Sequence, residues 1–215
     1  MTPAADGSLD PQGPVADAIA ELWWLMLGLG VAVFVAVAVV LTLGLFRRRP
    51  EAEQKPDQER PNRFGGWFVG GGVVLPAVIL VVVFGATVQA MRAVSDDVPS
   101  EALEIEVVGH QWWWEIRYPD EGITTTNELH LPVGRPVKLQ LTSADVIHSF
   151  WVPALAGKMD LLPDHANTLV LEADEPGEHS SRCAEFCGLE HAKMVLTVVA
   201  EPEDRFASWV AARRG

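Results

Sequence analysis

The chain is organised around one stretch, Cys183-Ala-Glu-Phe-Cys-Gly-Leu-Glu-His-Ala-Lys-Met194. These twelve residues contain both cysteines of the protein, one of its six histidines and a methionine. The spacing C-x3-C-x3-H-x2-M lets one tight loop turn all four donors toward a common point. Thiolate, imidazole and thioether are ligands that copper prefers, whereas calcium and magnesium take carboxylates and carbonyls. A second imidazole has to come from elsewhere, and His148, in Asp145-Val-Ile-His-Ser-Phe-Trp-Val-Pro153, is the best placed.

A disulfide and a zinc site are the alternatives to copper. Two cysteines four positions apart in an extracytoplasmic domain often form a disulfide. A Cys2His2 zinc site is also conceivable, although its usual paired spacings are absent. Taken alone, Met194 is typical of a core side chain and His148 of a buried, hydrogen-bonded histidine. Zinc rarely takes a thioether and a disulfide needs no nearby histidine, so the combination favours copper.

The motif C-x-E-x-C-G-x-x-H-x-x-M, preceded by D-V-x-H-S-F-x-V-P, resembles the CuA domain of cytochrome c oxidase subunit II. The resemblance covers nearly the whole chain: two membrane helices, a Gly-His-Gln-Trp-x-Trp strand and the two copper segments. It implies a binuclear copper centre in which both cysteine sulfurs bridge two copper ions. It also implies that the Glu185 side chain binds a magnesium or manganese ion at the junction with subunit I. The implied copper ligands are His148, Cys183, Cys187, His191, Met194 and the backbone carbonyl of Glu185.

Two long apolar stretches precede this region. Residues 22–46 and 64–91 contain no charged residue, and each is long enough to span a hydrocarbon core of ~30 Å at ~1.5 Å per residue. Gly70-Gly-Gly72 and Pro76 interrupt the second stretch, which membrane helices tolerate. The predicted order is an extracytoplasmic tail (1–21), transmembrane helix 1 (22–46), a cytoplasmic loop (47–63), transmembrane helix 2 (64–92), a cupredoxin-like CuA domain (96–201), and a C-terminal helix and tail (202–215).

Basic residues set the orientation of these helices. The loop contains Arg47, Arg48, Arg49, Lys55, Arg60 and Arg63, whereas the N-terminal tail has acidic residues and no basic one. Basic residues favour the cytoplasmic side, so we expect both termini on the periplasmic side of a bacterial-type inner membrane. No acidic residue lies between Phe64 and Met91, and we therefore assign no carboxylate at the mouth of a proton path to this chain.

From residue 96 the sequence is typical of a polar, all-β domain. Short alternating segments separated by turn signals predict a β-sandwich or Greek-key barrel, and the resemblance implies a cupredoxin-like barrel with the metal held by loops at one end. The full prediction is an N-terminal transmembrane helical hairpin followed by this barrel. Residues 203–212 predict a short amphipathic helix. The predicted strands cover 103–108, 127–131, 136–141, 167–171 and 193–199.

The domain is strongly acidic, with 21 Asp and Glu against 9 Lys and Arg from residue 96 onward. Such acidity serves solubility at the least, and beside a copper centre it indicates salt-dependent steering of a basic protein donor. With a net charge of −13 for the whole chain, we expect no nucleic-acid partner.

Gly109-His-Gln-Trp-Trp-Trp114 places three tryptophans on a predicted strand, where they must point to alternating faces. The simpler interpretation is core packing plus a subunit interface. The resemblance instead implies that Trp112 lies at the surface near the copper and accepts the electron from cytochrome c. It matches Asp145 to a docking position, and we add Asp120 and Glu121 from their loop alone. We interpret His110, His130, His165 and His179 as structural or surface residues.

The resemblance thus implies a subunit of a respiratory cytochrome c oxidase that performs electron transfer only. It takes electrons from cytochrome c or a cupredoxin and passes them to haem in subunit I, where oxygen is reduced. Two alternatives stay open: the CuA subunit of another respiratory reductase, such as nitric oxide reductase, and a membrane-anchored copper chaperone. A quinol oxidase subunit is disfavoured because that branch has lost the copper ligands.

Overall fold

The computed structural model describes residues 7, 9–47, 65–93 and 102–214. It divides into two units, which are described separately: Met1–Ala20 with Ala90–Gly215, and Glu21–Gln89. Most of the predicted cytoplasmic loop, including every basic residue after Arg47, lies outside the described residues.

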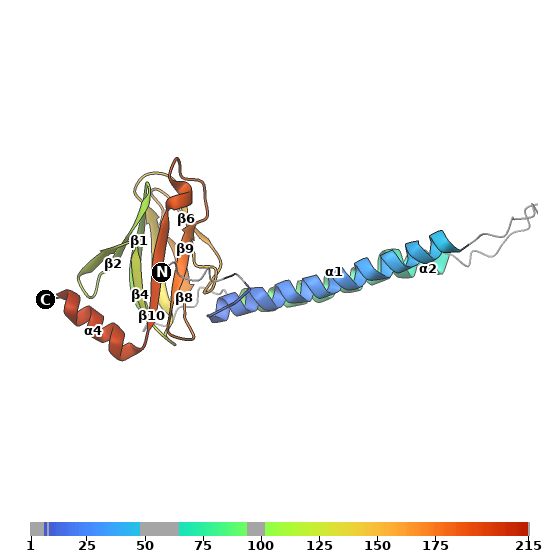
Figure 1. The fold of residues 1–215 in the computed structure, drawn as a ribbon, viewed down its shortest axis with the longest axis horizontal. Helices are drawn as coiled ribbons and strands as arrows, with labels where there is room; N and C mark the ends of the chain where they lie inside the picture. The colour runs from blue at the N-terminus through green and yellow to red at the C-terminus, as the bar shows by residue number, and fades with distance from the viewer. Residues whose placement is uncertain (1–6, 8, 48–64, 94–101, 215) are drawn as a thin grey trace, which may run out of the picture. The chain divides into compact units, whose positions relative to one another are not determined.

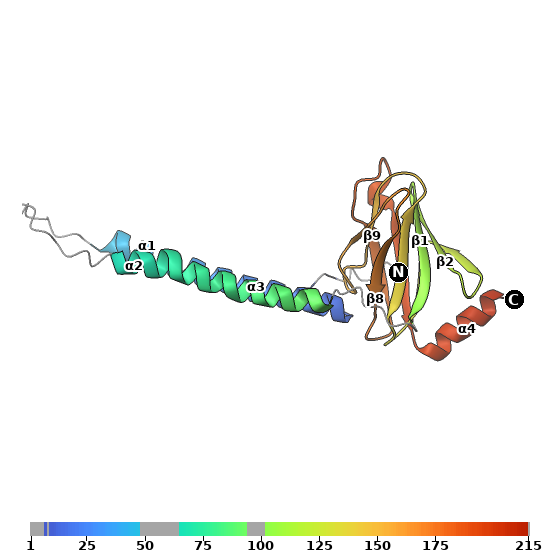
Figure 2. The ribbon, with the colours of Figure 1, turned by 180° about the vertical axis from the view of Figure 1, so that it is seen from behind.

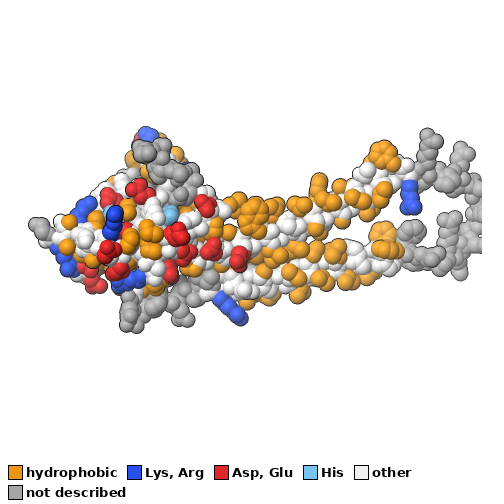
Figure 3. All heavy atoms as spheres, turned by 60° about the horizontal axis from the view of Figure 1, so that its bottom comes forward, with side chains coloured by type: hydrophobic (Ala, Val, Ile, Leu, Met, Phe, Trp, Pro, Cys, Tyr) orange, Lys and Arg blue, Asp and Glu red, His pale blue; other side chains and the backbone are white. Residues whose placement is uncertain are grey.

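The smaller unit consists of two long apolar helical segments that lie side by side (Figure 2). Hydrophobic side chains cover both segments over most of their length (Figure 3). By length and composition both are able to cross a membrane, so the chain fits a two-pass membrane protein followed by a periplasmic-type domain. The segments are α1 (Pro14–Phe46), and α2 (Gly65–Val69), η1 (Gly70–Val74) and α3 (Leu75–Ala93) in continuous succession.

The second segment widens into one π-helical turn over η1. Pro76 has no backbone N–H, so the α-helical hydrogen bond to the Gly72 carbonyl cannot form. At the preceding residue, the N–H of Leu75 donates to the carbonyl of Gly70. This i to i−5 spacing is the wider hydrogen-bond pattern of a π-helix. The glycines and the proline that interrupt this stretch therefore change the helix locally without ending it.

The larger unit is an all-β domain of two five-stranded sheets, ordered β3-β2-β1-β5-β8 and β4-β10-β9-β6-β7 (Figure 1). Neighbouring strands are antiparallel except for the parallel pairs β1–β5 and β4–β10. The predicted architecture of a helical hairpin followed by an all-β domain is confirmed. The strands are β1 (Leu103–His110), β2 (Trp113–Tyr118), β3 (Ile123–Thr126), β4 (Glu128–Pro132), β5 (Val137–Ser143), β6 (His148–Trp151), β7 (Met159–Leu161), β8 (Asn167–Leu171), β9 (Gly177–Cys183) and β10 (Val195–Glu201).

One hydrophobic core joins the inner faces of both sheets. Its largest fully buried side chains are Trp114, Tyr118 and Phe150. Helix α4 (Glu203–Arg214) follows β10 and closes the domain. Its Phe206 and Val210 side chains are buried in the hydrophobic core. The loops that follow β1, β5 and β9 form the end of the barrel opposite α4.

The prediction that three tryptophans share one strand is wrong. β1 ends at His110 and β2 begins at Trp113, and these two residues face each other in an antiparallel hairpin. Gln111 and Trp112 form its two-residue turn. Trp114 is fully buried, while Trp113 stacks on the His110 ring with the centroids 4.1 Å apart.

Candidate metal centre

Strand pairing positions the ends of the motif loop. β9 ends at Cys183, and the chain returns through a 3₁₀ turn, η2 (His191–Lys193), before β10 begins. The N–H of Cys183 donates to the carbonyl of Met194 at 3.1 Å, which closes the base of the loop. His148 is the first residue of β6, which pairs with β9.

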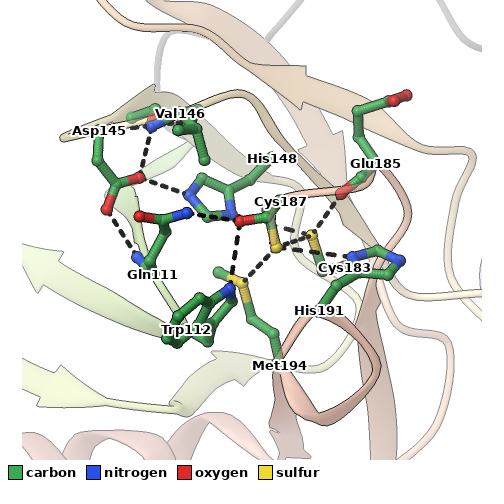
Figure 4. Close-up of polar contacts among 11 residues, drawn as sticks. Gln111, Trp112, Asp145, Val146, His148, Cys183, Glu185, Cys187, His191 and Met194 are labelled. Atoms are coloured by element: carbon green, nitrogen blue, oxygen red, sulfur yellow. Dashed lines mark hydrogen bonds and ion pairs between the residues drawn. The ribbon is translucent and has the colours of Figure 1, made fainter. Parts of the chain in front are cut away.

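The two thiols lie between the two imidazoles (Figure 4). The sulfurs of Cys183 and Cys187 are 3.7 Å apart. His148 Nδ1 lies 3.9 Å from the Cys183 sulfur, and His191 Nδ1 lies 3.6 Å from the Cys187 sulfur. Each thiol therefore lies next to one imidazole, and the donor atom of His148 is also within 4.8 Å of the Cys187 sulfur.

Each thiol also has one weaker donor beside it. The Met194 Sδ atom lies 3.8 Å from the Cys187 sulfur. The Glu185 carbonyl oxygen lies 3.2 Å from the Cys183 sulfur. The structure thus brings together all six ligands that the resemblance implies, from two segments of the chain.

The geometry fits a metal and not a disulfide. Both cysteines are free, and their 3.7 Å separation is far above a disulfide bond of about 2.0 Å. A metal–thiolate bond is about 2.3 Å long, so one ion is able to contact both sulfurs. The donor atoms of His148, Cys183 and Cys187 all lie within 4.8 Å of one another, and all three residues are buried. Soft donors in a dry site suit copper.

The two thiols differ in their pKa values. Burial opposes ionisation of Cys183, but hydrogen bonds with His148 and with the backbone at Ser149 and Glu185 outweigh it and lower the pKa of the thiol to about 6. Burial, and then the charge on Cys183, raise the pKa of Cys187 to about 12. Cys187 therefore keeps its proton at neutral pH.

Asp145 fixes the ring of His148. Its Oδ1 atom lies 2.8 Å from His148 Nε2, while Oδ2 accepts the N–H of Gln111 at 2.7 Å. Burial disfavours the charged carboxylate, yet these contacts and the N–H of Val146 prevail and lower the pKa of Asp145. With Nε2–H donated to the carboxylate, Nδ1 is left facing the Cys183 sulfur, as in carboxylate–histidine–metal triads.

Trp112 contacts the same loop directly. Its indole N–H donates to the carbonyl of Cys187 at 3.2 Å, and the side-chain amide of Gln111 donates to that carbonyl at 2.7 Å. Trp112 is partly exposed, so it lies between the solvent and the loop that carries the second thiol.

The structure does not bring Asp120 and Glu121 to this site. They lie in the turn after β2, whose six residues extend over about 16 Å from the Trp113 end. The guanidinium of Arg214, on α4, donates to the carbonyl oxygens of both and pairs with the Glu121 carboxylate. The Glu121 carboxylate is thus engaged by α4 at the opposite end of the barrel.

The remaining residues have simpler surroundings. The Glu185 side chain is exposed and points away from the sulfurs (Figure 4). His110 contacts Glu115 at 3.1 Å, and His130 lies between two carboxylates. Gln111 was not predicted as a site residue. Its side-chain amide donates a hydrogen bond to the Cys187 carbonyl, 76 positions away in the sequence, and no local pattern signals such a contact.

Comparisons with known proteins find subunits of terminal oxidases. The family described as "Cytochrome C oxidase subunit II, periplasmic domain" matches residues 121–201. "Cytochrome c oxidase subunit 2" of Alkalihalophilus pseudofirmus is 35% identical over 212 residues, which is 94% of this chain and 60% of that protein. "Quinol oxidase subunit 2" of Bacillus cereus is 32% identical over 210 residues, which is 94% of this chain and 71% of that protein.

The larger unit also resembles a solved structure, the periplasmic domain of subunit II of cytochrome oxidase (CoxB) of Bradyrhizobium japonicum. The TM-score is 0.52 at 32% identity, covering 54% of this chain and 96% of that domain. This likeness confirms the predicted cupredoxin-like fold. Because the matches extend over both helices and the β domain, the chain belongs to the cytochrome c oxidase subunit II family.

Proposed function

We propose that this chain is the electron-accepting subunit of a respiratory cytochrome c oxidase and holds a binuclear copper centre. One observation carries the proposal: two buried thiols 3.7 Å apart lie between two imidazoles. A single tetrahedral ion would use four donors around one point. This site instead offers more donors: two thiols, an imidazole on either side of them, and one weak donor beside each thiol. The ligands are His148, Cys183, Cys187, His191, Met194 and the carbonyl of Glu185.

The chain's own residues prepare this site for electron transfer. When bound, the copper pair supplies a one-electron redox centre whose charge both ions share. The β6–β9 pairing and the Asp145 contact hold His148 in place, so little reorganisation accompanies the transfer. Burial of both thiols keeps water from the sulfurs.

Trp112 is the residue through which we infer that the electron enters. It is partly exposed and donates a hydrogen bond to Cys187, the residue that carries the second thiol. An electron donor that stacks on the exposed part of this ring is separated from the metal-site loop only by the Trp112 side chain. We keep Asp145, Asp120 and Glu121 as docking residues only as a prediction, with Asp145 the one near the site.

The partners follow from the same proposal. The donor is a c-type cytochrome or a cupredoxin, and the acceptor is haem in subunit I of a haem-copper oxidase. The β domain lies on the periplasmic side of an inner membrane, because the basic residues of the loop favour the cytoplasm. The exposed carboxylate of Glu185 is available for a magnesium or manganese ion at the subunit I interface.

A quinol oxidase subunit is the second candidate. The Bacillus cereus relative named for that activity shares 32% identity over 94% of this chain. The complete set of soft donors around Cys183 and Cys187 favours the copper function instead.

Two measurements test the proposal. The full chain, purified in detergent and loaded with copper, is expected to show a seven-line EPR hyperfine pattern from two equivalent copper nuclei. A four-line signal, or zinc without copper, contradicts it. The oxidase that contains this chain should then consume oxygen with reduced cytochrome c and not with a quinol alone. Nitric oxide reduction in place of oxygen reduction, or rapid loss of copper to an acceptor protein, supports the reductase or the chaperone alternative.

A further inference from the structure

The two thiols of the site are anchored differently. Cys183 ends β9, faces Phe150 of β6, and donates its N–H to the Met194 carbonyl. The next N–H, of Ala184, donates to the carbonyl of Ser149 at 2.9 Å. The position of Cys183 therefore follows from the sheet. Cys187 lies beyond the end of β9, in the loop before η2, and needs another support.

The turn between β1 and β2 supplies that support (Figure 4). The carbonyl of Cys187 accepts the side-chain amide of Gln111 at 2.7 Å and the indole N–H of Trp112 at 3.2 Å. Gly188 has a φ of +121°, and a Cβ there would lie 3.0 Å from the Gln111 amide nitrogen and 3.2 Å from the Trp112 ring. The turn thus packs directly on the loop backbone, where a side chain on residue 188 does not fit.

The same turn reaches the other ligand segment. The backbone N–H of Gln111 donates to Asp145 Oδ2 at 2.7 Å, and Asp145 Oδ1 holds His148 Nε2. At the end of β1, a Cβ on Gly109 would lie 2.8 Å from His148 Cδ2. One residue, Gln111, therefore hydrogen-bonds to both segments that carry the candidate ligands.

We propose that Gln111 is a positioning residue of the metal centre, holding the carbonyl of Cys187 with its side chain while its backbone N–H holds Asp145. The part that concerns copper rests on the proposed function, whereas the anchoring of the Cys187 loop does not. Loss of the side-chain bond lets this loop open, because the carbonyl then keeps only the longer bond from Trp112.

The test uses the full chain, reduced and metal-free, in detergent. Gln111→Met keeps the length of the side chain and the backbone N–H but removes the amide donor. Iodoacetamide alkylation, read separately at each cysteine by peptide mass spectrometry, should become about tenfold faster at Cys187, since alkylation of a buried thiol follows local opening. Cys183, which the sheet anchors, should change little. The matched control is Gln140→Met on β5, which should alkylate as the unsubstituted chain does.

Trp112→Phe adds an independent check because both donors share one acceptor. Either single variant leaves the Cys187 carbonyl one partner, whereas the double variant leaves it none. The double variant should therefore accelerate Cys187 alkylation by more than the product of the two single effects. An unchanged rate in Gln111→Met, equal acceleration at both cysteines, or the same change in Gln140→Met overturns the proposal.

A copper measurement separates this inference from the proposed function. In copper-loaded protein, release to a chelator should be about tenfold faster in Gln111→Met, within the range seen for residues that support metal ligands. If the unsubstituted chain shows no two-copper signal but the alkylation result holds, the copper function fails and Gln111 still anchors the loop. If the signal is present and neither rate changes, the copper function stands and the positioning role is overturned.

Discussion

Two buried histidines, His148 near the metal centre and His130 beside α4, both contact carboxylates, yet their rings are used differently. His148 has Asp145 at 2.8 Å on one nitrogen and the Cys183 sulfur at 3.9 Å on the other. His130 has Glu201 at 2.7 Å on one nitrogen and Glu128 on the other. Its ring also stacks on an indole of α4, with centroids 4.2 Å apart.

The difference shows what identifies a ligand in this fold. A ring nitrogen that lies at hydrogen-bond distance from a carboxylate is occupied by that contact. Both nitrogens of His130 face carboxylates, whereas His148 keeps one that faces soft donors. Burial and an acidic neighbour are common to both residues. The neighbour of the second nitrogen is what marks His148, and not His130, as a candidate metal ligand.

The strongest test of this contrast is to remove each ring in turn. His148→Ala should abolish the two-copper EPR signal, because one end of the thiol pair loses its nitrogen donor. His130→Ala should leave the signal intact and lower only the thermal midpoint of the domain. Copper content by mass spectrometry, measured on the same samples, checks both results. Loss of the signal in both variants, with folding retained, contradicts the assignment.

A smaller effect is expected when only the orienting carboxylate changes. Asp145→Asn keeps the shape of the side chain but replaces one oxygen with a donor, so His148 no longer has a charged partner at 2.8 Å. Copper affinity should fall by about 10–100-fold, measured by competition with a chelator. Glu201→Gln, which makes the corresponding change beside His130, is the control and should leave copper affinity unchanged.

The sequence was informative where one strong pattern carried the structure. Soft donors at fixed spacing predicted residues that the structure brings together at the metal centre, and alternating apolar positions predicted β1, β4, β5, β8 and β10. β9 was missed because its inward-facing residues are His179, Ser181 and Cys183, which read as polar although all three are buried. Polar residues on an inner face break the alternation on which strand prediction depends.

Contacts distant in sequence were beyond prediction for a different reason. Asp120 and Glu121 were predicted as docking residues from their loop alone, but α4 brings Arg214 onto that turn from 93 positions away. Gln111 likewise gains its role from Cys187. Neither pairing leaves a periodic or spaced pattern, since both depend on how the two sheets and α4 pack in space.

The packing beside His130 gives the next prediction. Trp209 stacks on His130, lies edge-on to Tyr118 at 5.2 Å, and has the Arg213 guanidinium 5.6 Å from its ring centroid. A fully buried Trp→Ala change costs about 3–5 kcal/mol, and we expect about 2 kcal/mol for this partly buried ring. Trp209→Ala should lower the thermal midpoint without changing the copper signal. A changed EPR spectrum would mean that the two ends of the barrel are coupled.

The smallest effect concerns a third histidine–carboxylate contact, on the outside of the β1–β2 hairpin. Glu115 lies 3.1 Å from His110 Nε2 and 2.9 Å from Arg117 Nε. The hydrogen bond from Arg117 outweighs burial and, with His110, lowers the pKa of Glu115. A carboxyl whose pKa is lower in the folded chain contributes stability above its unfolded pKa of about 4.3. That contribution is lost as the pH falls through the lowered value.

Glu115→Gln should therefore destabilise the domain at pH 7 by a few tenths of a kcal/mol to about 1 kcal/mol, the range of partly exposed ion pairs. The difference from the unsubstituted chain should shrink as the pH falls below about 4.3 and vanish once the carboxyl is protonated in both states. Thermal unfolding across this pH range measures it. Glu104→Gln is the control, because Glu104 faces Lys138 at 3.5 Å with 47% of its side chain exposed, and its effect should be smaller. A Glu115→Gln difference that stays constant with pH would show that shape, and not charge, supports the hairpin beside the metal centre.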